Sequence, residues 1–199
     1  MAGHVRRLRD HGASKSDLER HIEQGGALLP DYDILGYNYR MTDFQGALGV
    51  CQMGKADYIL KKRRKAAQRY NEALKDVEAL ITPYVPEGYT HGYQSYVCLF
   101  TGCSDLSGLD MEKINNLNVL RNKFMDKLEG KGIATRQGTH AVHTLGYYKK
   151  KYNLNDADFI NSYVADRLSI TLPLYAEMTN EEQDYVVGQL KVEYQTLKM

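Results

Sequence analysis

A helical pattern that runs from Thr42 to about Asp76 almost without a breaker restricts the fold more than any other feature of the sequence. Thr42 and Gln45 have the spacing of a capping box, in which each side chain bonds the backbone amide of the other residue at the start of a helix. Each glycine inside a helix costs about 1 kcal/mol relative to alanine, and Gly54 is the last glycine of this stretch. We therefore expect a helix that begins after Thr42 and bends near Gly54.

The rest of the chain alternates between strand and helix patterns. Residues 93–101 are rich in aromatic and β-branched side chains and predict a strand. Residues 111–128 predict an amphipathic helix whose apolar positions are Ile114, Leu117, Leu120, Phe124 and Leu128. The remaining expected elements are a helix-like stretch over 1–24 broken at Gly12, a loop over 25–40, strands over 133–136 and 169–172, helices over 144–152 and 157–168, and a final helix from the capping-box pair Thr179 and Glu182 to about Leu197. This order predicts a small mixed α/β layer.

Length and composition limit the classes of protein. A chain of 199 residues forms one domain or two small ones, and its net charge of +1 gives no general case for nucleic acid or an anionic membrane as partner. Three cysteines without a CxxC pair argue against a disulfide framework or a structural zinc site and favour a reduced, cytosolic compartment. No apolar run approaches the roughly 20 residues of a membrane span, and no signal peptide is recognisable, so we expect no membrane association.

The basic run Lys61-Lys62-Arg63-Arg64-Lys65 is the strongest local concentration of charge. Such a run is either a nucleic-acid-binding patch or the solvated face of a helix. The lack of aromatic residues within the run and the near-neutral balance of the chain favour the solvated face.

Two polar loops are candidate sites. The stretch Gly36-Tyr37-Asn38-Tyr39-Arg40 places an amide, two phenols and a guanidinium before a capped helix, and helix N-termini attract anions. A phosphate is the obvious ligand, although a helix-entry loop is often only structural. The second loop, residues 135–140, is polar, contains a glycine and follows a predicted strand. Binding residues often lie on such loops.

The pair His140 and His143 has two interpretations. Two imidazoles can hold a metal ion, but no cysteine or carboxylate lies nearby in the sequence to complete a ligand set. The alternative is contact with a substrate, and we expect no metal site. The sequence contains no Ser-His-Asp order, Walker loop, GxGxxG or HExxH motif. The residues alone therefore indicate a soluble α/β protein with two polar loops.

Several separated motifs resemble those of one enzyme family, in collinear order over essentially the whole chain. Residues 36–49, GYNYRMTDFQGALG, resemble the signature of the DegT/StrS sugar-nucleotide aminotransferases. The other matching stretches are Leu8-Arg9-Asp10-His11-Gly12, Gly132-Ile133-Ala134-Thr135-Arg136, His140 to His143 with Tyr147-Tyr148, and Leu172-Pro173-Leu174-Tyr175 with Met178-Thr179.

The resemblance implies the C-terminal portion of a fold-type-I transferase that depends on pyridoxal 5′-phosphate (PLP), of the aspartate-aminotransferase-like superfamily. Residues 1–57 would be the tail of the large PLP-binding domain, and residues 58–199 would be a small α+β domain with a short antiparallel sheet flanked by helices. The implied enzyme is a cytoplasmic homodimer. It would convert a nucleotide-linked keto sugar to an amino sugar, with glutamate as amino donor, in surface-polysaccharide or amino-sugar biosynthesis.

The resemblance also assigns roles to individual residues. Asn38 matches the asparagine that reaches across the dimer to the PLP phosphate. The substrate-binding residues that it implies are Tyr39, Arg40, Arg136, His140 and His143.

The Schiff-base lysine of the family lies upstream of the stretch that matches residues 8–12, so its position would precede Met1. Lys15 and Lys55 lie in the wrong place to replace it, and we expect no catalytic residue in this chain. The first hypothesis is therefore a part of an aminotransferase that is inactive alone. A stand-alone, non-catalytic interaction module derived from this domain is the alternative, and nucleic-acid binding through residues 61–65 is a distant third.

Overall fold

The computed structural model describes residues 1–15, 19, 22, 31–102, 106 and 108–198. The chain divides into two compact units, Met1–Lys55 and Ala56–Met199, and each is described by itself. The expected loop over residues 25–30 and most of the helix-like stretch after residue 15 lie outside the described residues. Among the described helices, none is long and apolar enough to cross a membrane.

In the first unit, the segment after helix α1 (Ala2–Arg9) lies antiparallel to residues 31–39. Isolated bridges join Asp10 to Asn38 and Ala13 to Tyr32. Backbone hydrogen bonds continue the pairing, with the Tyr37 amide donating to Leu8 at 2.7 Å and the Tyr39 amide donating to Arg9 at 2.8 Å. The first polar loop is thereby fixed against the end of α1.

The two chain segments of this unit approach so closely that glycine is required at Gly12. Its φ is +81°, in the left-handed region. A Cβ atom at this position would lie 1.9 Å from the Ile34 carbonyl oxygen, which is far inside van der Waals contact. The break that the sequence predicts at Gly12 is therefore confirmed, and its cause is a backbone contact.

Helix α3 (Asp43–Met53) begins at the predicted capping box. The Gln45 amide donates to the Thr42 hydroxyl, and the Gln45 side chain accepts from the Thr42 amide at 2.9 Å. Gly54 caps the end of α3, and α4 (Ala56–Ala73) begins two residues later, so the interruption at Gly54 is confirmed.

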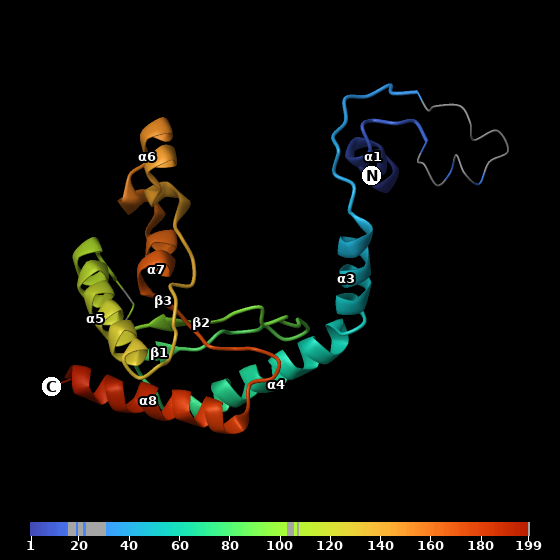
Figure 1. The fold of residues 1–199 in the computed structure, drawn as a ribbon. Coiled ribbons are helices and arrows are strands. Elements are labelled where there is room, and N and C mark those ends of the chain that lie inside the picture. The colour runs from blue at the N-terminus through green and yellow to red at the C-terminus, as the bar shows by residue number, and fades with distance from the viewer. Residues whose placement is uncertain (16–18, 20–21, 23–30, 103–105, 107, 199) are drawn as a thin grey trace. The chain divides into compact units, whose positions relative to one another are not determined.

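The second unit is built on a three-stranded antiparallel sheet in the order β1 (Leu80–Ile81), β2 (Tyr96–Phe100), β3 (Ser169–Leu172). The remaining elements are α5 (Met111–Glu129), the short 3₁₀ turns Val142–Thr144 and Asp156–Phe159, α6 (Gly146–Tyr152), α7 (Ile160–Leu168) and α8 (Asn180–Lys198). Figure 1 shows α5, α7 and α8 near the sheet, whereas α6 lies farther from it, beyond α7. The expected short antiparallel sheet with flanking helices is confirmed.

Strand prediction was only partly right in this unit. The predicted strand over 133–136 is wrong, because only Arg136 pairs, in an isolated bridge with Thr171. The two-residue strand β1 was not predicted at all. Residues 93–95 of the predicted strand precede β2, which begins at Tyr96.

The core of the second unit lies where α4, α5 and α8 pack with the sheet. Tyr70 of α4 and Tyr96 of β2 are fully buried, with ring centroids 4.9 Å apart. Their hydroxyls donate to the Pro173 carbonyl oxygen and to the Asn71 side chain. Burial raises the pKa of both phenols well above the usual value. Each fully buried large side chain contributes roughly 1.5–3 kcal/mol.

Helix α5 corrects one predicted core position. Ile114, Phe124 and neighbours on the same face are buried as expected, but Leu120 is exposed and Arg121 takes the buried position. The Arg121 guanidinium donates to the Arg167 carbonyl oxygen at 3.0 Å. Burial lowers the pKa of Arg121, and the nearby Asp166 charge opposes that shift. A hydrogen-bonded guanidinium can therefore occupy a position that the hydrophobic pattern gives to leucine.

Candidate functional site

The first polar loop carries Asn38, Tyr39 and Arg40 on the surface of the first unit. The rings of Tyr37 and Tyr39 stack with centroids 5.2 Å apart and an interplanar angle of 7°. The Arg40 Nε atom lies 3.5 Å from the Asp10 carboxylate. The structure therefore brings these three predicted residues together, beside the end of α1.

A cavity of about 620 Å³, lined mostly by basic side chains, lies beside this loop, and two of these side chains, Arg7 and Arg40, form ion pairs with Asp33 and Asp10. Its charged lining residues are Arg6, Arg7, Arg9, Asp10, Lys15, Glu19 and Arg40. Five cations and two carboxylates leave a net charge of +3 (5 − 2), which is suited to an anion. The backbone of Asn38, whose side chain is exposed, is bridged to Asp10 of the lining. This donor set fits a phosphate group, such as that of PLP.

The second polar loop, residues 135–143, is held to the sheet of the second unit. The Arg136 and Thr171 backbones exchange hydrogen bonds of 3.3 and 2.6 Å, and the Gly138 amide donates to the Ser169 hydroxyl at 2.9 Å. A Cβ at Gly138 would lie 2.5 Å from the Val97 side chain, so glycine is needed for this contact. The exposed Arg136 side chain is thereby fixed at a defined place on the sheet.

Asp166, which sequence reasoning missed, anchors the same loop from α7. It is buried, and its Oδ1 atom accepts from Gln137 Nε2 at 2.6 Å and from the Ala141 amide at 3.2 Å. His140 Nδ1 lies 3.8 Å from the same oxygen. The sequence does contain a signal for the burial of Asp166. It follows Tyr163 by three residues, which places both side chains on one face of a helix.

The two histidines differ in their surroundings. The His140 side chain is 76% exposed, whereas His143 is only 4% exposed and stacks on Phe159 with ring centroids 4.9 Å apart. The His143 Nε2 atom is buried with no hydrogen-bond partner in the described part of the chain. Within that part, no three His, Cys, Asp or Glu side chains gather in a way that could hold a metal ion.

The basic run of α4 is more than a solvated face. Arg63 donates to the carbonyl oxygens of Tyr93, Gln94 and Leu174 at 3.0, 2.8 and 3.4 Å. Arg64 donates to the His91 carbonyl oxygen at 3.0 Å. The three lysines of the run are exposed. Two of the five charged side chains are thus used to fix the segments beside β2 and β3.

Comparison with known proteins identifies the class. The sequence pattern of the DegT/DnrJ/EryC1/StrS aminotransferase family matches residues 1–191, and the chain belongs to this family. It is 30% identical over 193 residues to an uncharacterised protein of Methanocaldococcus jannaschii, covering 96% of this chain and 46% of that protein. It is also 30% identical over 188 residues to the spore coat polysaccharide biosynthesis protein SpsC of Bacillus subtilis, covering 94% of this chain and 45% of that protein.

A solved structure shows the same fold. A candidate sugar aminotransferase of Streptococcus pneumoniae in its PMP form superposes with a TM-score of 0.77 at 22% identity. The superposition covers 96% of this chain and 44% of that one. Aminotransferases of this family are PLP-dependent, and another structure of the Streptococcus pneumoniae protein is in its PLP form. The chain spans less than half the length of the curated relatives given above.

Proposed function

We propose that this chain supplies the C-terminal part of a PLP-dependent aminotransferase that converts a nucleotide-linked keto sugar to an amino sugar. The observation that carries the proposal is the loop of Asn38 and Arg40, which is fixed against Asp10 beside a cavity of net positive charge in a chain of the aminotransferase family. A role in polysaccharide biosynthesis is supported by the Bacillus subtilis relative.

In this proposal the first unit binds anionic groups. The Asn38 amide donates to the cofactor phosphate, and Arg40 with Tyr39 contacts the substrate. When bound, the cofactor supplies the electron sink for transfer of the amino group. The Asp10 carboxylate, 3.5 Å from the Arg40 Nε atom, would orient the guanidinium.

The second unit would bind the sugar nucleotide through its polar loop. Arg136 offers an exposed cation to the diphosphate, His140 offers an exposed hydrogen-bonding ring, and His143 forms part of the wall. Asp166 acts through the loop and is a positioning residue, because its hydrogen bonds are to Gln137 and Ala141.

The Schiff-base lysine would come from protein outside this chain, so the chain alone would not turn over. We further propose glutamate as amino donor, a homodimer in which Asn38 reaches the cofactor of the partner subunit, and a cytoplasmic location. The reduced cysteines expected from the sequence support that location.

Two preparations test the proposal. PLP is added to the chain alone and to a fusion of the chain with the part of Bacillus subtilis SpsC that precedes the matched region, and each is reduced with borohydride and mapped by mass spectrometry. We expect an internal-aldimine absorbance band and one modified lysine in the fusion, at a position from SpsC, and no defined adduct in the chain alone. A single stoichiometric adduct in the chain alone would contradict the missing-lysine proposal.

Variants of the fusion separate cofactor binding from folding. Asn38→Ala removes one phosphate hydrogen bond and should weaken PLP binding about tenfold, as expected for a hydrogen bond to a charged group. Asn122→Ala changes the same residue type on the exposed face of α5 and should have no effect. Unchanged PLP affinity in Asn38→Ala would remove the assigned role.

The second candidate is a stand-alone, non-catalytic interaction module. It is favoured by one observation, the second unit's own apolar core. A fusion that folds but forms no aldimine, together with a stable isolated chain, would support this alternative.

A further inference from the structure

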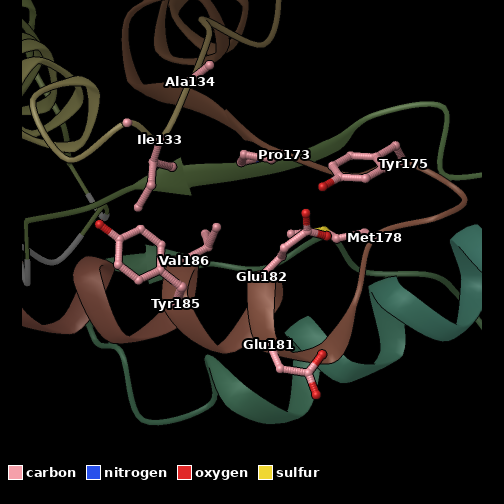
Figure 2. A pocket seen from close by; sticks show the side chains of 10 residues that line it. Ile133, Ala134, Pro173, Tyr175, Met178, Glu181, Glu182, Tyr185 and Val186 are labelled. Atoms are coloured by element: carbon pink, nitrogen blue, oxygen red, sulfur yellow. The ribbon is translucent and has the colours of Figure 1, made fainter.

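The second unit contains a cavity of about 560 Å³, and none of its lining residues was given a binding role above. It lies between the 132–134 segment, the residues that follow β3, and the first turns of α8 (Figure 2). Its volume is in the range of small-molecule sites, roughly 300–1,000 Å³. Its apolar lining residues include Ile133, Pro173, Met178 and Val186.

Two tyrosine rings, Tyr175 and Tyr185, lie at opposite ends of this cavity (Figure 2). The Tyr185 hydroxyl donates to the Lys131 carbonyl oxygen at 3.0 Å. The Tyr175 hydroxyl is hydrogen-bonded to Glu182, and this bond raises the pKa of the phenol. Both hydroxyls are therefore committed to protein groups, which restricts rotation of the rings and leaves their aromatic surfaces for a ligand.

The Glu182 carboxylate lies between the two rings (Figure 2). It accepts from the Thr179 amide at 2.8 Å as part of the capping box of α8. This backbone bond and the bond from Tyr175 lower the pKa of Glu182, so the group is ionised at neutral pH. No lysine, arginine or histidine lines the cavity, and no ion pair of Glu182 occurs among the described residues.

Fixed tyrosine rings, an ionised carboxylate and an apolar wall together suit a ligand that has a positive charge and an apolar body. We propose that this cavity binds a small organic cation, a protonated primary amine carried on an apolar or aromatic body. The ammonium group would lie between Glu182 and a tyrosine ring, where both charge attraction and the cation–π interaction favour it. The apolar body would cover Ile133 and Val186.

The test uses benzylamine, which is protonated at pH 7, and benzyl alcohol as a neutral ligand of the same shape. Each is titrated into the ¹⁵N-labelled 199-residue chain while amide NMR shifts are recorded. We expect saturable shifts at Gly132, Tyr185 and Val186, with a dissociation constant in roughly the millimolar range for so small a ligand. Benzyl alcohol should bind more weakly.

Two matched variants identify the carboxylate that matters. Glu182→Gln removes the charge but keeps the capping box, because glutamine serves there as well as glutamate. It should weaken benzylamine binding about threefold to tenfold and leave benzyl alcohol unchanged. Glu181→Gln makes the same change one residue earlier, at a lining residue whose side chain extends away from the rings (Figure 2), and should weaken benzylamine binding much less than Glu182→Gln does.

Three results would overturn the proposal. They are the absence of saturable shifts at these amides, equal affinity for the amine and the alcohol, and an equal effect of Glu181→Gln and Glu182→Gln. None of these results depends on aminotransferase activity, so the proposal of a cation site and the proposed function can be contradicted separately.

Discussion

The unit Met1–Lys55 and the unit Ala56–Met199 achieve order in different ways. In the first, neither α1 nor α3 buries a residue, and the described contacts are backbone hydrogen bonds between residues 8–14 and 31–39 together with ion pairs. In the second, the helices and the sheet share an apolar core. The second unit therefore has its own apolar core, whereas the first unit exposes apolar side chains of α3, such as Phe44 and Leu48. Exposed apolar surface of this kind is typical of a binding surface, and we expect another protein surface to cover it.

We expect the largest change in the free energy of unfolding from a substitution of the buried Phe124, with the exposed Phe44 as its control. Phe124 is fully buried in the second unit, whereas Phe44 in α3 is 91% exposed. Phe124→Ala should lower the free energy of unfolding by about 3–5 kcal/mol, and Phe44→Ala should change it by less than about 0.5 kcal/mol. Urea denaturation followed by circular dichroism measures both. Similar losses in the two variants would show that the units do not differ as described.

Gly12 tests whether backbone contact orders the first unit. Gly12→Ala places a Cβ against the Ile34 carbonyl oxygen and forces alanine to a φ of +81°. We expect a local loss of about 1–3 kcal/mol, measured as faster hydrogen exchange of the Tyr37 and Tyr39 amides. Gly46→Ala is the control, because its Cβ would meet open space inside α3. Unchanged exchange in Gly12→Ala would contradict the close approach.

The pH dependence of stability should differ between Cys98 in the second unit and Cys51 in the first. Burial raises the pKa of Cys98 to about 12, while Cys51 in α3 is exposed. Because the folded state favours the neutral thiol, the stability contribution is complete below the unfolded pKa of about 8.5 and falls as the pH rises toward 12, by up to about 1.4 kcal/mol per pH unit. The difference in unfolding free energy between the wild-type chain and Cys98→Ala should show this slope between pH 9 and 11. Cys51→Ala should retain the wild-type pH dependence.

Thiol labelling gives a second measurement of the same difference. Iodoacetamide at pH 8 should modify Cys51 in the folded chain and reach Cys98 only on unfolding, as read by peptide mapping. Rapid labelling of Cys98 in the folded chain would contradict the burial of β2.

The smallest expected effect concerns Asp166. Asp166→Asn keeps an acceptor for Gln137 and Ala141 but removes the charge, so the loop should lose about 1 kcal/mol of local stability. Faster hydrogen exchange of the Ala141 amide measures this loss. Asp126→Asn on the exposed side of α5 is the matched control. Equal exchange in the two variants would remove the positioning role.

Local signals predicted the ends of elements well. Both capping boxes, Thr42 with Gln45 and Thr179 with Glu182, form the expected hydrogen bonds because the interacting groups are three residues apart. The two polar loops were also recognisable, since glycine and polar residues follow or precede clear periodic patterns.

Features that depend on distant neighbours were not predictable. Strand β1 has two residues and exists because Leu80 and Ile81 pair with Phe100 and Leu99, which no local period can show. Arg121 is buried because the Arg167 carbonyl oxygen accepts its hydrogen bond. Asp166 is buried because a loop some 25 residues earlier brings the Ala141 amide to it. In each case the deciding partner lies far along the chain.

The bonds of Arg63 bear on how this protein could be engineered. The basic run of α4 could be removed to suppress adhesion to nucleic acid during purification. The sequence alone would suggest that all five cations be neutralised. Only the three lysines are available for such a change, because the Nη1 atom of Arg63 donates to three backbone carbonyl oxygens and Arg64 donates to a fourth. The surface that can be redesigned is therefore smaller than the surface that is charged.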